Sequence, residues 1–351
     1  MSQYKIFNCL DSIAEGWYWA LHSLELRRGQ VVPLTFLGKE LAIYRGEDGK
    51  IVALDAYCPH MGAHLAEGRI EGNSLRCLFH YWKYAPNGHC TEIPALGGCP
   101  PALVRTSSWP VQEKYGLIWV WTGEKPRYPI PYVPELEGME TDSALGNRFV
   151  KNCHPNVVMI NAIDAHHFNS VHKLPVRLEM KSREINSNCI IFSNITPIDP
   201  ISWFRRLIKR FYKGPLTYSM SYWYGSTGTV TLGPDFLHFH IIFALRLIGE
   251  GKTEGQTILV TKRRKSLLGI LLNRFLLFFT RVVGIFFANG DALIFRSIRF
   301  DLKTPIATDR PILQFIQHLE SQKIASWIPS EKTKSVQNVN PVQPESETLV
   351  C

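Results

Sequence analysis

Residues 58–64 read Cys-Pro-His-Met-Gly-Ala-His, and residues 77–82 read Cys-Leu-Phe-His-Tyr-Trp. Each segment offers one thiol and one imidazole, the first at Cys58 and His60 and the second at Cys77 and His80. Two short loops of this kind can hold either a tetrahedral zinc ion or a [2Fe–2S] cluster in which histidines ligate one of the two irons. The usual zinc motifs leave about two to four residues between ligands, so the single residue in Cys-x-His favours the cluster over zinc.

The sequence around these two loops predicts a small all-β domain. The two loops are rich in Gly and Pro and lie between strand-like segments, where binding residues are commonly placed. We assign residues 1–125 to this domain, with a core from about 15 to 122. Alternating apolar segments that read as antiparallel strands occupy residues 31–36, 41–44, 51–54 and 116–121.

Residues 126–328 predict a second domain of the α+β class, in which helices pack on an antiparallel sheet. A segment with four prolines, residues 123–134, links it to the first domain. The tail, residues 329–351, is polar and aperiodic, and we expect it to be disordered. Strands are expected at 189–195, 217–224, 237–245 and 256–262, and helical segments near 158–172 and 266–300.

Composition excludes several classes of protein. The chain has 351 residues, 45% hydrophobic and 20% charged, which excludes disorder, collagen and coiled coil as the overall class. Eight cysteines are too few for a disulfide scaffold, and the N-terminus has no apolar run, so we expect a reducing, cytoplasmic compartment. The net charge of +9 suits an acidic protein partner or a membrane surface, and nothing else in the sequence supports nucleic-acid binding.

A second cluster of candidate ligands lies at residues 161–172, which read Asn-Ala-Ile-Asp-Ala-His-His-Phe-Asn-Ser-Val-His. On a helix, Asp164 and His167 share a face, whereas His167 and His172 point about 140° apart. The two histidines can therefore meet at one metal only if the helix ends or bulges between them. With a distant carboxylate they would form the facial triad of a non-haem iron oxygenase. Alone, the segment is equally consistent with a packed helix, but the upstream Cys/His motif favours the metal.

Together the two motifs resemble the catalytic α subunits of Rieske-type non-haem iron oxygenases, over roughly residues 15–320. The likeness is greatest to the branch of 3-ketosteroid 9α-hydroxylases and cholesterol 7-desaturases. It implies an N-terminal Rieske [2Fe–2S] domain followed by a catalytic domain of helix-grip type. It also implies that Cys58 and Cys77 ligate one cluster iron and that His60 and His80 ligate the other.

The resemblance implies a second iron centre in the catalytic domain. His167 and His172 would hold a mononuclear Fe(II). Asp164 matches the family carboxylate that bridges an iron-ligating histidine to a Rieske histidine of a neighbouring subunit. Asn161 matches an asparagine that is often found near the iron.

The third iron ligand in the family is an Asp on a late helix. We choose Asp291, with Asp301 as the fallback, and expect Asp309 to cap the next helix. The sequence departs from the family at two positions: Tyr81 stands where Gly is usual, and Ile160 stands where Glu is frequent. Neither change removes a ligand, but both alter the surroundings of the metal centres.

The implied function is that of an oxidoreductase, the terminal oxygenase of an electron-transfer system. It would use O₂ to hydroxylate, desaturate or oxidatively dealkylate a hydrophobic substrate of sterol, isoprenoid or polycyclic type. The chain has no Gly-x-Gly-x-x-Gly fingerprint, so electrons are expected from a separate ferredoxin or reductase. The family also implies a head-to-tail homotrimer. The alternative is a non-catalytic Rieske electron-transfer protein, although about 200 residues beyond the cluster domain argue against it.

Two segments combine apolar and basic residues, 267–287 and 201–213. One interpretation is a buried core helix with a solvated run of charge. The other is peripheral contact with an anionic membrane, through which a lipophilic substrate would arrive. In the second segment, apolar contact would come from Trp203, Phe204 and Phe211, and contact with headgroups from Arg205, Arg206, Lys209, Arg210 and Lys213.

Overall fold

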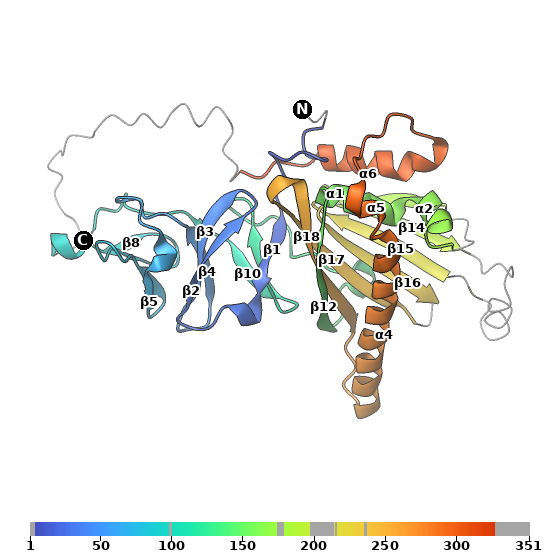
Figure 1. The fold of residues 1–351 in the computed structure, drawn as a ribbon. Coiled ribbons are helices and arrows are strands. Elements are labelled where there is room, and N and C mark those ends of the chain that lie inside the picture. The colour runs from blue at the N-terminus through green and yellow to red at the C-terminus, as the bar shows by residue number, and fades with distance from the viewer. Residues whose placement is uncertain are drawn as a thin grey trace. The chain divides into compact units, whose positions relative to one another are not determined.

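The computed structural model describes residues 4–97, 100–173, 179–196, 214, 216–234 and 237–326, except for the side chains of 195–196, 286–287 and 289. The predicted disordered tail and the basic segment 201–213 lie outside the described residues. The described chain forms two compact units (Figure 1). One unit comprises residues 20–128, and the other joins the residues up to Trp19 to residues 129–324.

The unit of residues 20–128 is built from short antiparallel strands, as predicted. Its apolar core is formed by residues such as Ala42, Leu54, Leu65 and Leu75, all of which are buried. The sheets have the orders β2-β3-β4-β9, β5-β6-β7-β8 and β1-β11-β10. The strands are β1 (Trp17–His22), β2 (Val31–Phe36), β3 (Lys39–Arg45), β4 (Ile51–Asp55), β5 (Arg69–Glu71), β6 (Ser74–Arg76), β7 (Lys83–Tyr84), β8 (Cys90–Glu92), β9 (Ser108–Trp109), β10 (Val111–Lys114) and β11 (Leu117–Trp121).

The second unit contains a seven-stranded antiparallel sheet in the order β12-β18-β17-β16-β15-β14-β13. This architecture confirms the predicted α+β class. The strands are β12 (Thr141–Lys151), β13 (Lys181–Asn186), β14 (Cys189–Thr196), β15 (Leu216–Trp223), β16 (Thr227–Pro234), β17 (Phe239–Ile248) and β18 (Lys252–Lys262). The helices are α1 (Pro155–Ile160), α2 (Ala165–Ser170), α4 (Leu267–Asp291), α5 (Ile294–Ser297) and α6 (Arg310–Glu320).

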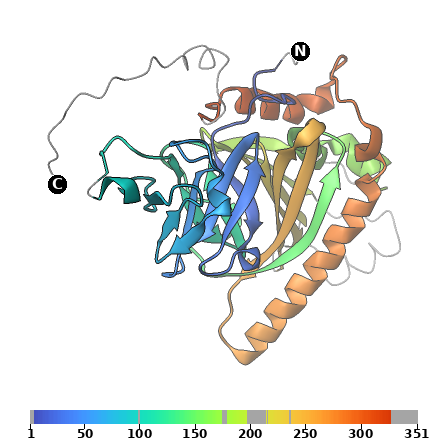
Figure 2. The same cartoon turned by 60° about the vertical axis from the view of Figure 1, so that its left-hand side comes forward.

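The alternation of side chains along the inner strand β15 separates the two faces of this sheet. On one face, Tyr222 donates to the backbone carbonyl of Met159 in α1 and packs on Phe315 of α6. On the other face, Trp223 packs on Tyr132 of the segment that precedes β12. Helices α1 and α6 therefore lie on one face of the sheet, and Figure 2 shows α4 and α6 outside the strands. Tyr218 of β15, two residues before Tyr222 on an alternate position, points to the same face and packs on Phe168 of α2, the helix that carries His167.

The N-terminal segment differs from the predicted assignment of residues 1–125 to a single domain. The backbone N–H groups of Lys5, Ile6 and Phe7 donate to the carboxylate of Glu320 at distances of 2.6, 2.8 and 2.7 Å. Phe7 is buried and packs edge-on against Phe315. These contacts join the N-terminus to helix α6 of the second unit. Local sequence pattern cannot reveal such a contact between residues more than 300 positions apart.

Candidate iron–sulfur and iron sites

Two loops of the all-β unit carry the four predicted cluster ligands. The first loop follows β4 and is closed by the hydrogen bond from Cys58 N–H to the carbonyl of Ala63, 2.9 Å. Gly62 within it has φ of +73°, a backbone conformation that glycine adopts without strain. The second loop connects β6 to β7, and Cys77 N–H donates to the carbonyl of Trp82, 2.9 Å. Each closure holds one Cys and one His at the end of a strand pair.

The four side chains divide into a buried pair and an exposed pair. Cys58 and Cys77 are buried in the core, and burial raises the pKa of the Cys77 thiol. The side-chain rings of His60 and His80 are exposed, and their centroids lie 4.6 Å apart. Thiols on the inside and imidazoles on the outside match the two irons of a Rieske cluster, one with sulfur ligands and one with nitrogen ligands.

The same arrangement argues against a single zinc ion. A tetrahedral metal needs all its ligand atoms around one point, with bonds of about 2.0–2.3 Å. Within the described part of the chain, the one group of three or more candidate ligands within 4.8 Å of one another lies elsewhere, at His167, His172 and Asp291. The Cys and His pairs are thus spaced as two half-sites, which fits a cluster with two irons.

Aromatic and charged side chains surround the half-sites. The indole of Trp82 stacks on His60 with centroids 4.3 Å apart and planes 8° apart. The hydroxyl of Tyr84, which is fully buried, lies 3.0 Å from the sulfur of Cys58. Arg76 donates to the carbonyl of Tyr81 at 2.6 Å and so supports the backbone directly after His80. Tyr84 was missed by sequence reasoning, because only the folded loops bring it to Cys58.

Tyr81, the residue that replaces the usual glycine, has φ of +61°. This is the left-handed region, which costs a bulky L-residue roughly 1–2 kcal/mol. The glycine expected from the family resemblance would adopt this conformation freely. The ring of Tyr81 lies under the Arg69 guanidinium at 5.5 Å, a contact that offsets part of the strain.

The second candidate site depends on where helix α2 ends. The helix ends at Ser170, and Val171 is its C-cap, so the chain changes direction between His167 and His172. Such a break is required for His167 and His172, which are five residues apart, to reach one metal. The rings of His167 and His172 consequently approach each other, with centroids 4.6 Å apart and planes 77° apart.

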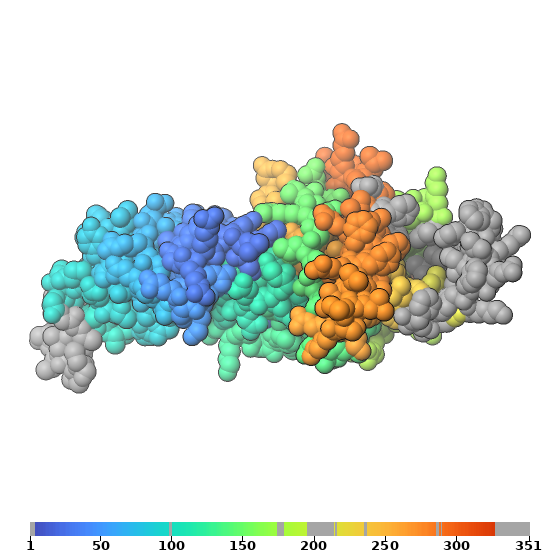
Figure 3. Space-filling view, turned by 90° about the horizontal axis from the view of Figure 1, so that it is seen from below, coloured from blue at the N-terminus to red at the C-terminus, as the bar shows by residue number. Residues whose placement is uncertain are grey.

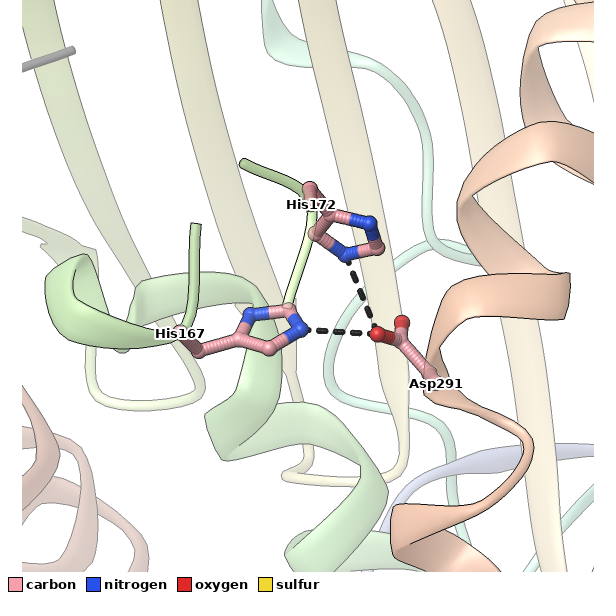
Figure 4. A group of neighbouring side chains, drawn as sticks. All are labelled: His167, His172 and Asp291. Atoms are coloured by element: carbon pink, nitrogen blue, oxygen red, sulfur yellow. Dashed lines mark hydrogen bonds and ion pairs between the residues drawn. The ribbon is translucent and has the colours of Figure 1, made fainter. Parts of the chain in front are cut away.

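Asp291, the last residue of α4, completes the group (Figure 4). Its Oδ1 atom lies 2.7 Å from Nε2 of His167 and 3.0 Å from Nε2 of His172. Both histidine side chains are buried, and burial lowers the pKa of His172, which favours the neutral imidazole that binds metals. Asp301 instead forms an ion pair with Lys303, and Asp291 alone of the two candidates meets the histidines.

Two nitrogens and one carboxylate oxygen on one side of a common point are the donor set of a mononuclear non-haem iron. Among the described residues, no partner satisfies the buried Nδ1 atom of His167, while its Nε2 atom faces Asp291. The Nε2 atoms of both histidines therefore point to the position where a metal would be held. We conclude that the group fits a mononuclear iron.

Asp164 holds helix α2 in a way that the sequence did not predict, whereas Asn161 lies beside the iron position as expected. Asp164 occupies the N-cap of α2, where its Oδ1 accepts the backbone N–H groups of His166 and His167 at 2.9 and 3.2 Å. No described contact joins this carboxylate to the ring of His167, so within one chain it holds the backbone of the ligand rather than its imidazole. The amide nitrogen of Asn161 does reach that ring, 3.1 Å from Nε2.

Asp309 lies at the N-cap position of α6, but its side chain makes no capping bond there. Its Oδ2 accepts the N–H of Ile306 at 2.9 Å instead. Sequence reasoning also missed the aromatic side chains around the histidines. Phe168 lies 5.3 Å from the ring of His167, and Tyr218 lies 5.2 Å from Phe168. Phe168 was visible within the His-rich segment, whereas Tyr218 comes from β15.

Comparison with known proteins identifies the domain that carries the first site. Residues 16–110 match the Rieske [2Fe-2S] domain family. A probable 3-ketosteroid-9-alpha-monooxygenase, oxygenase component, of Rhodococcus rhodochrous is 37% identical over 168 residues, covering 46% of this chain and 42% of that protein. The cholesterol 7-desaturase of Bombyx mori is 35% identical over 173 residues, covering 48% of this chain and 37% of that protein. The match thus spans less than half the length of either curated relative.

Similarity of fold extends over both units. The solved structure of NdmB from Pseudomonas putida CBB5 superposes with a TM-score of 0.64 at 18% identity, covering 86% of this chain and 89% of that one. A Rieske domain followed by a helix-covered antiparallel sheet is therefore an architecture that this chain shares with known proteins. The chain therefore contains a Rieske [2Fe-2S] domain, and it is similar in sequence to the oxygenase component of a 3-ketosteroid-9-alpha-monooxygenase and in fold to NdmB.

Proposed function

We propose that this protein is a terminal oxygenase that uses O₂ and externally supplied electrons to hydroxylate, desaturate or oxidatively dealkylate a hydrophobic substrate. The observation that carries the proposal is the convergence of His167, His172 and Asp291 in a chain that also has a Rieske domain. An electron-transfer protein would need the cluster alone. A facial group of three ligands leaves positions open for O₂ and thereby supplies oxidative chemistry when iron is bound.

The residues around the iron position have distinct roles in this proposal. His167, His172 and Asp291 hold the metal and fix its open side. Asn161 lies against Nε2 of His167 and limits the positions that this ring can take. Phe168 and Tyr218 form an aromatic wall beside the histidines, and burial keeps the phenol of Tyr218 protonated by raising its pKa. Such a wall excludes water from the reacting position.

The electrons would come from a separate ferredoxin or reductase. The excess of basic residues, +9 overall, suits an acidic donor protein. The exposed imidazoles of His60 and His80 provide the contact through which an electron would reach the cluster. We further propose a homotrimer in which the cluster of one chain serves the iron of the next.

Two observations support a hydrophobic substrate and a reducing compartment. Curated relatives at about 35% identity are named for 3-ketosteroid and cholesterol chemistry, so we propose a sterol-like, isoprenoid or polycyclic substrate. The cysteines that the structure describes, six in number, are all free thiols. Free thiols agree with a cytoplasm-like location.

Purification under anaerobic conditions, followed by iron and sulfide analysis, tests the two cofactor sites. We expect about three irons and two acid-labile sulfides per chain. The purified protein is then incubated with a surrogate reductase, O₂ and a panel of sterols and isoprenoids, and products are identified by mass spectrometry. Stoichiometric zinc without sulfide would refute the assignment of the first site.

Two variants separate the sites. His80→Ala is expected to abolish the visible spectrum of the cluster. His172→Ala is expected to keep that spectrum, lower the iron content by about one per chain, and abolish product formation. If His172→Ala retained full iron and full turnover, the His/His/Asp group would not be the catalytic centre. The alternative, an electron-transfer protein without catalysis, would then be favoured.

A further inference from the structure

The exposed side of helix α4 is apolar, which is unusual for a helix on the surface of a soluble protein. The side chains that it packs against its own unit are mostly small or polar: Asn273, Leu276 and Thr280 are each 2% exposed. Most of its large apolar side chains are exposed, although Phe279 also packs on Phe239 of β17 with ring centroids 5.2 Å apart. The exposed ones are Leu267, Leu268, Ile270, Leu271, Leu272, Phe275, Phe278, Phe279, Val282 and Ile285. A surface helix of a soluble protein ordinarily shows the reverse pattern.

The buried polar side chains of α4 have hydrogen-bond partners, so its polar side is stably packed against the unit. The amide of Asn273 donates to Asp142 at 2.7 Å and accepts from Arg264 at 2.7 Å. The hydroxyl of Thr280 donates to the carbonyl of Leu276 at 2.7 Å. Helix α4 is therefore fixed to its unit by specific polar contacts. What remains outside is a broad apolar face, with Leu268 at 79% and Phe278 at 65% exposure.

The arrangement of charge around this face is one-sided. At about 100° per residue, all of the exposed apolar side chains except Ile270 lie within an arc of roughly 140°, and Arg274 and Arg281 lie together along one border of it. Neither arginine forms an ion pair with any described residue. Helix α4 and the turn before it contain no Asp or Glu from 255 to 290. Four further basic residues precede the helix, Lys262, Arg263, Arg264 and Lys265. Of these, Arg263 forms an ion pair with Asp142 and Lys265 forms one with Glu140.

We propose that α4 is a membrane-contacting helix that lies in the plane of an anionic lipid surface. Its exposed Leu and Phe side chains would enter the acyl boundary while Arg274 and Arg281 reach the headgroups. This combination of a wide apolar face with basic residues at its border is typical of interfacial helices. The apolar face is also far larger than the scattered exposed residues of ordinary soluble surfaces. Figures 2 and 3 show α4, coloured orange, lying along the outside of its unit.

A transmembrane orientation is a different arrangement of the same helix. The segment Leu267–Ile285 is long and apolar enough, with a mean hydropathy of 1.7, to cross a bilayer by those criteria alone. The buried contacts of Asn273, Leu276 and Thr280 hold one side of α4 against the sheet, however, and its last residue is Asp291 of the iron group. A helix bound along its length to its own unit can lie on a membrane but cannot cross one by itself.

A second copy of the chain is the other occupant that could cover this face. In a contact between two α4 helices the borders formed by Arg274 and Arg281 would add like charges to an interface, at a cost in affinity. An anionic lipid surface accommodates those charges and gains up to about 1 kcal/mol from each nearby cation. The charge pattern therefore favours lipid.

Flotation of the full-length protein with lipid vesicles tests the proposal. Vesicles of phosphatidylcholine, with and without phosphatidylglycerol, are compared at low and high salt. The wild-type protein is expected to float with both, more strongly with the anionic lipid and less strongly at high salt. Leu268→Glu/Leu271→Glu is expected to lower the partition coefficient about tenfold or more. Arg274→Gln/Arg281→Gln is expected to remove the preference for anionic vesicles.

A control changes two leucines outside α4 that are even more exposed than Leu268 and Leu271. Leu24→Glu/Leu103→Glu alters residues with 92% and 93% exposure and is expected to float like the wild type. The visible spectrum of the cluster verifies that each variant is folded. Three results would overturn the proposal: no flotation with either vesicle, an equal loss in the control, or a lipid-free oligomer that only Leu268→Glu/Leu271→Glu dissociates. None depends on turnover, so the test is independent of the proposed oxygenase activity.

Discussion

The hydrogen bond between Tyr84 and Cys58 is expected to raise the reduction potential of the cluster. The phenol is fully buried, and burial raises its pKa, so it keeps its proton. A sulfur atom bound to iron is a thiolate and has no proton to give. The hydroxyl must therefore donate across the 3.0 Å contact. Reduction adds a negative charge to the cluster, which strengthens a donated hydrogen bond.

Replacing Tyr84 by Phe removes this donor and leaves the ring in the core. A hydrogen bond to a charged group is worth about 1.5–3 kcal/mol, and we take about 1–2 kcal/mol as the part that favours the reduced state. For a one-electron couple, about 1.4 kcal/mol corresponds to about 59 mV. The midpoint potential of Tyr84→Phe should therefore lie about 40–80 mV below that of the wild type. Water cannot restore the bond, because the position is closed to solvent.

Protein-film voltammetry, or a redox titration followed by circular dichroism, measures the difference. Tyr44→Phe is the matched control, because Tyr44 is a buried tyrosine of the same core whose hydroxyl donates to the carbonyl of Asn73 at 3.0 Å. Its potential should equal that of the wild type within about 10 mV, which is under 0.3 kcal/mol. An intact cluster in Tyr84→Phe with an unchanged or higher potential would refute the reasoning.

Three further predictions concern local structure and pH. The free energy of unfolding in urea should be about 1 kcal/mol higher for Tyr81→Gly than for Tyr81→Ala. Both variants lose the contact with Arg69, and only the alanine is strained by the positive φ at this position. Equal free energies of unfolding would contradict the assigned strain. Burial lowers the pKa of His154 to about 4, so the folded state binds its proton less readily than the unfolded state. The contribution of His154 to the free energy of unfolding should therefore be complete above about pH 6.5 and fall toward pH 4 by about 1 kcal/mol per pH unit. In urea titrations, the free energy of unfolding of His154→Gln should depend less steeply on pH than that of the wild type. Asp164→Asn should retain both metals and the stability of α2, since Asn is an equally good N-cap. Its turnover should fall if the Asp164 carboxylate conducts electrons between the cluster and the iron. Iron analysis and product formation over many cycles measure both quantities, and wild-type turnover would exclude the electron-bridge role.

The parts of the protein that were predictable from sequence are those determined by local pattern. The two Cys/His segments could be identified because their ligands lie within four residues of one another in each loop. The strands that flank them are alternating or apolar, and β2 was predicted with the bounds that the structure has. Strands β12 and β13 were missed, because partial exposure on both faces gives them no clear alternation.

The third iron ligand shows where local pattern stops being sufficient. Three aspartates, Asp291, Asp301 and Asp309, lie within 19 positions of one another, and the spacing of none of them relates it to His167 or His172. The choice of Asp291 came from the family resemblance. The physical reason is visible only in the fold: α4 continues without interruption to residue 291 and delivers that carboxylate to the end of α2.

Helix α4 illustrates why composition could not distinguish a core helix from a membrane-contacting one. Both are long and rich in Leu and Phe, and the two alternatives differ only in which side of the helix faces the protein. The structure answers this through Asn273 and Thr280, whose polar side chains are buried while Leu268 and Phe278 are exposed. A helix held by polar contacts on its inner side does not depend on its outer apolar side for folding. That outer side is consequently free to bind lipid, and it belongs to the same helix that supplies Asp291. If the oxygenase function proposed above is correct, a lipophilic substrate dissolved in the membrane would need to travel only along α4 to reach the iron.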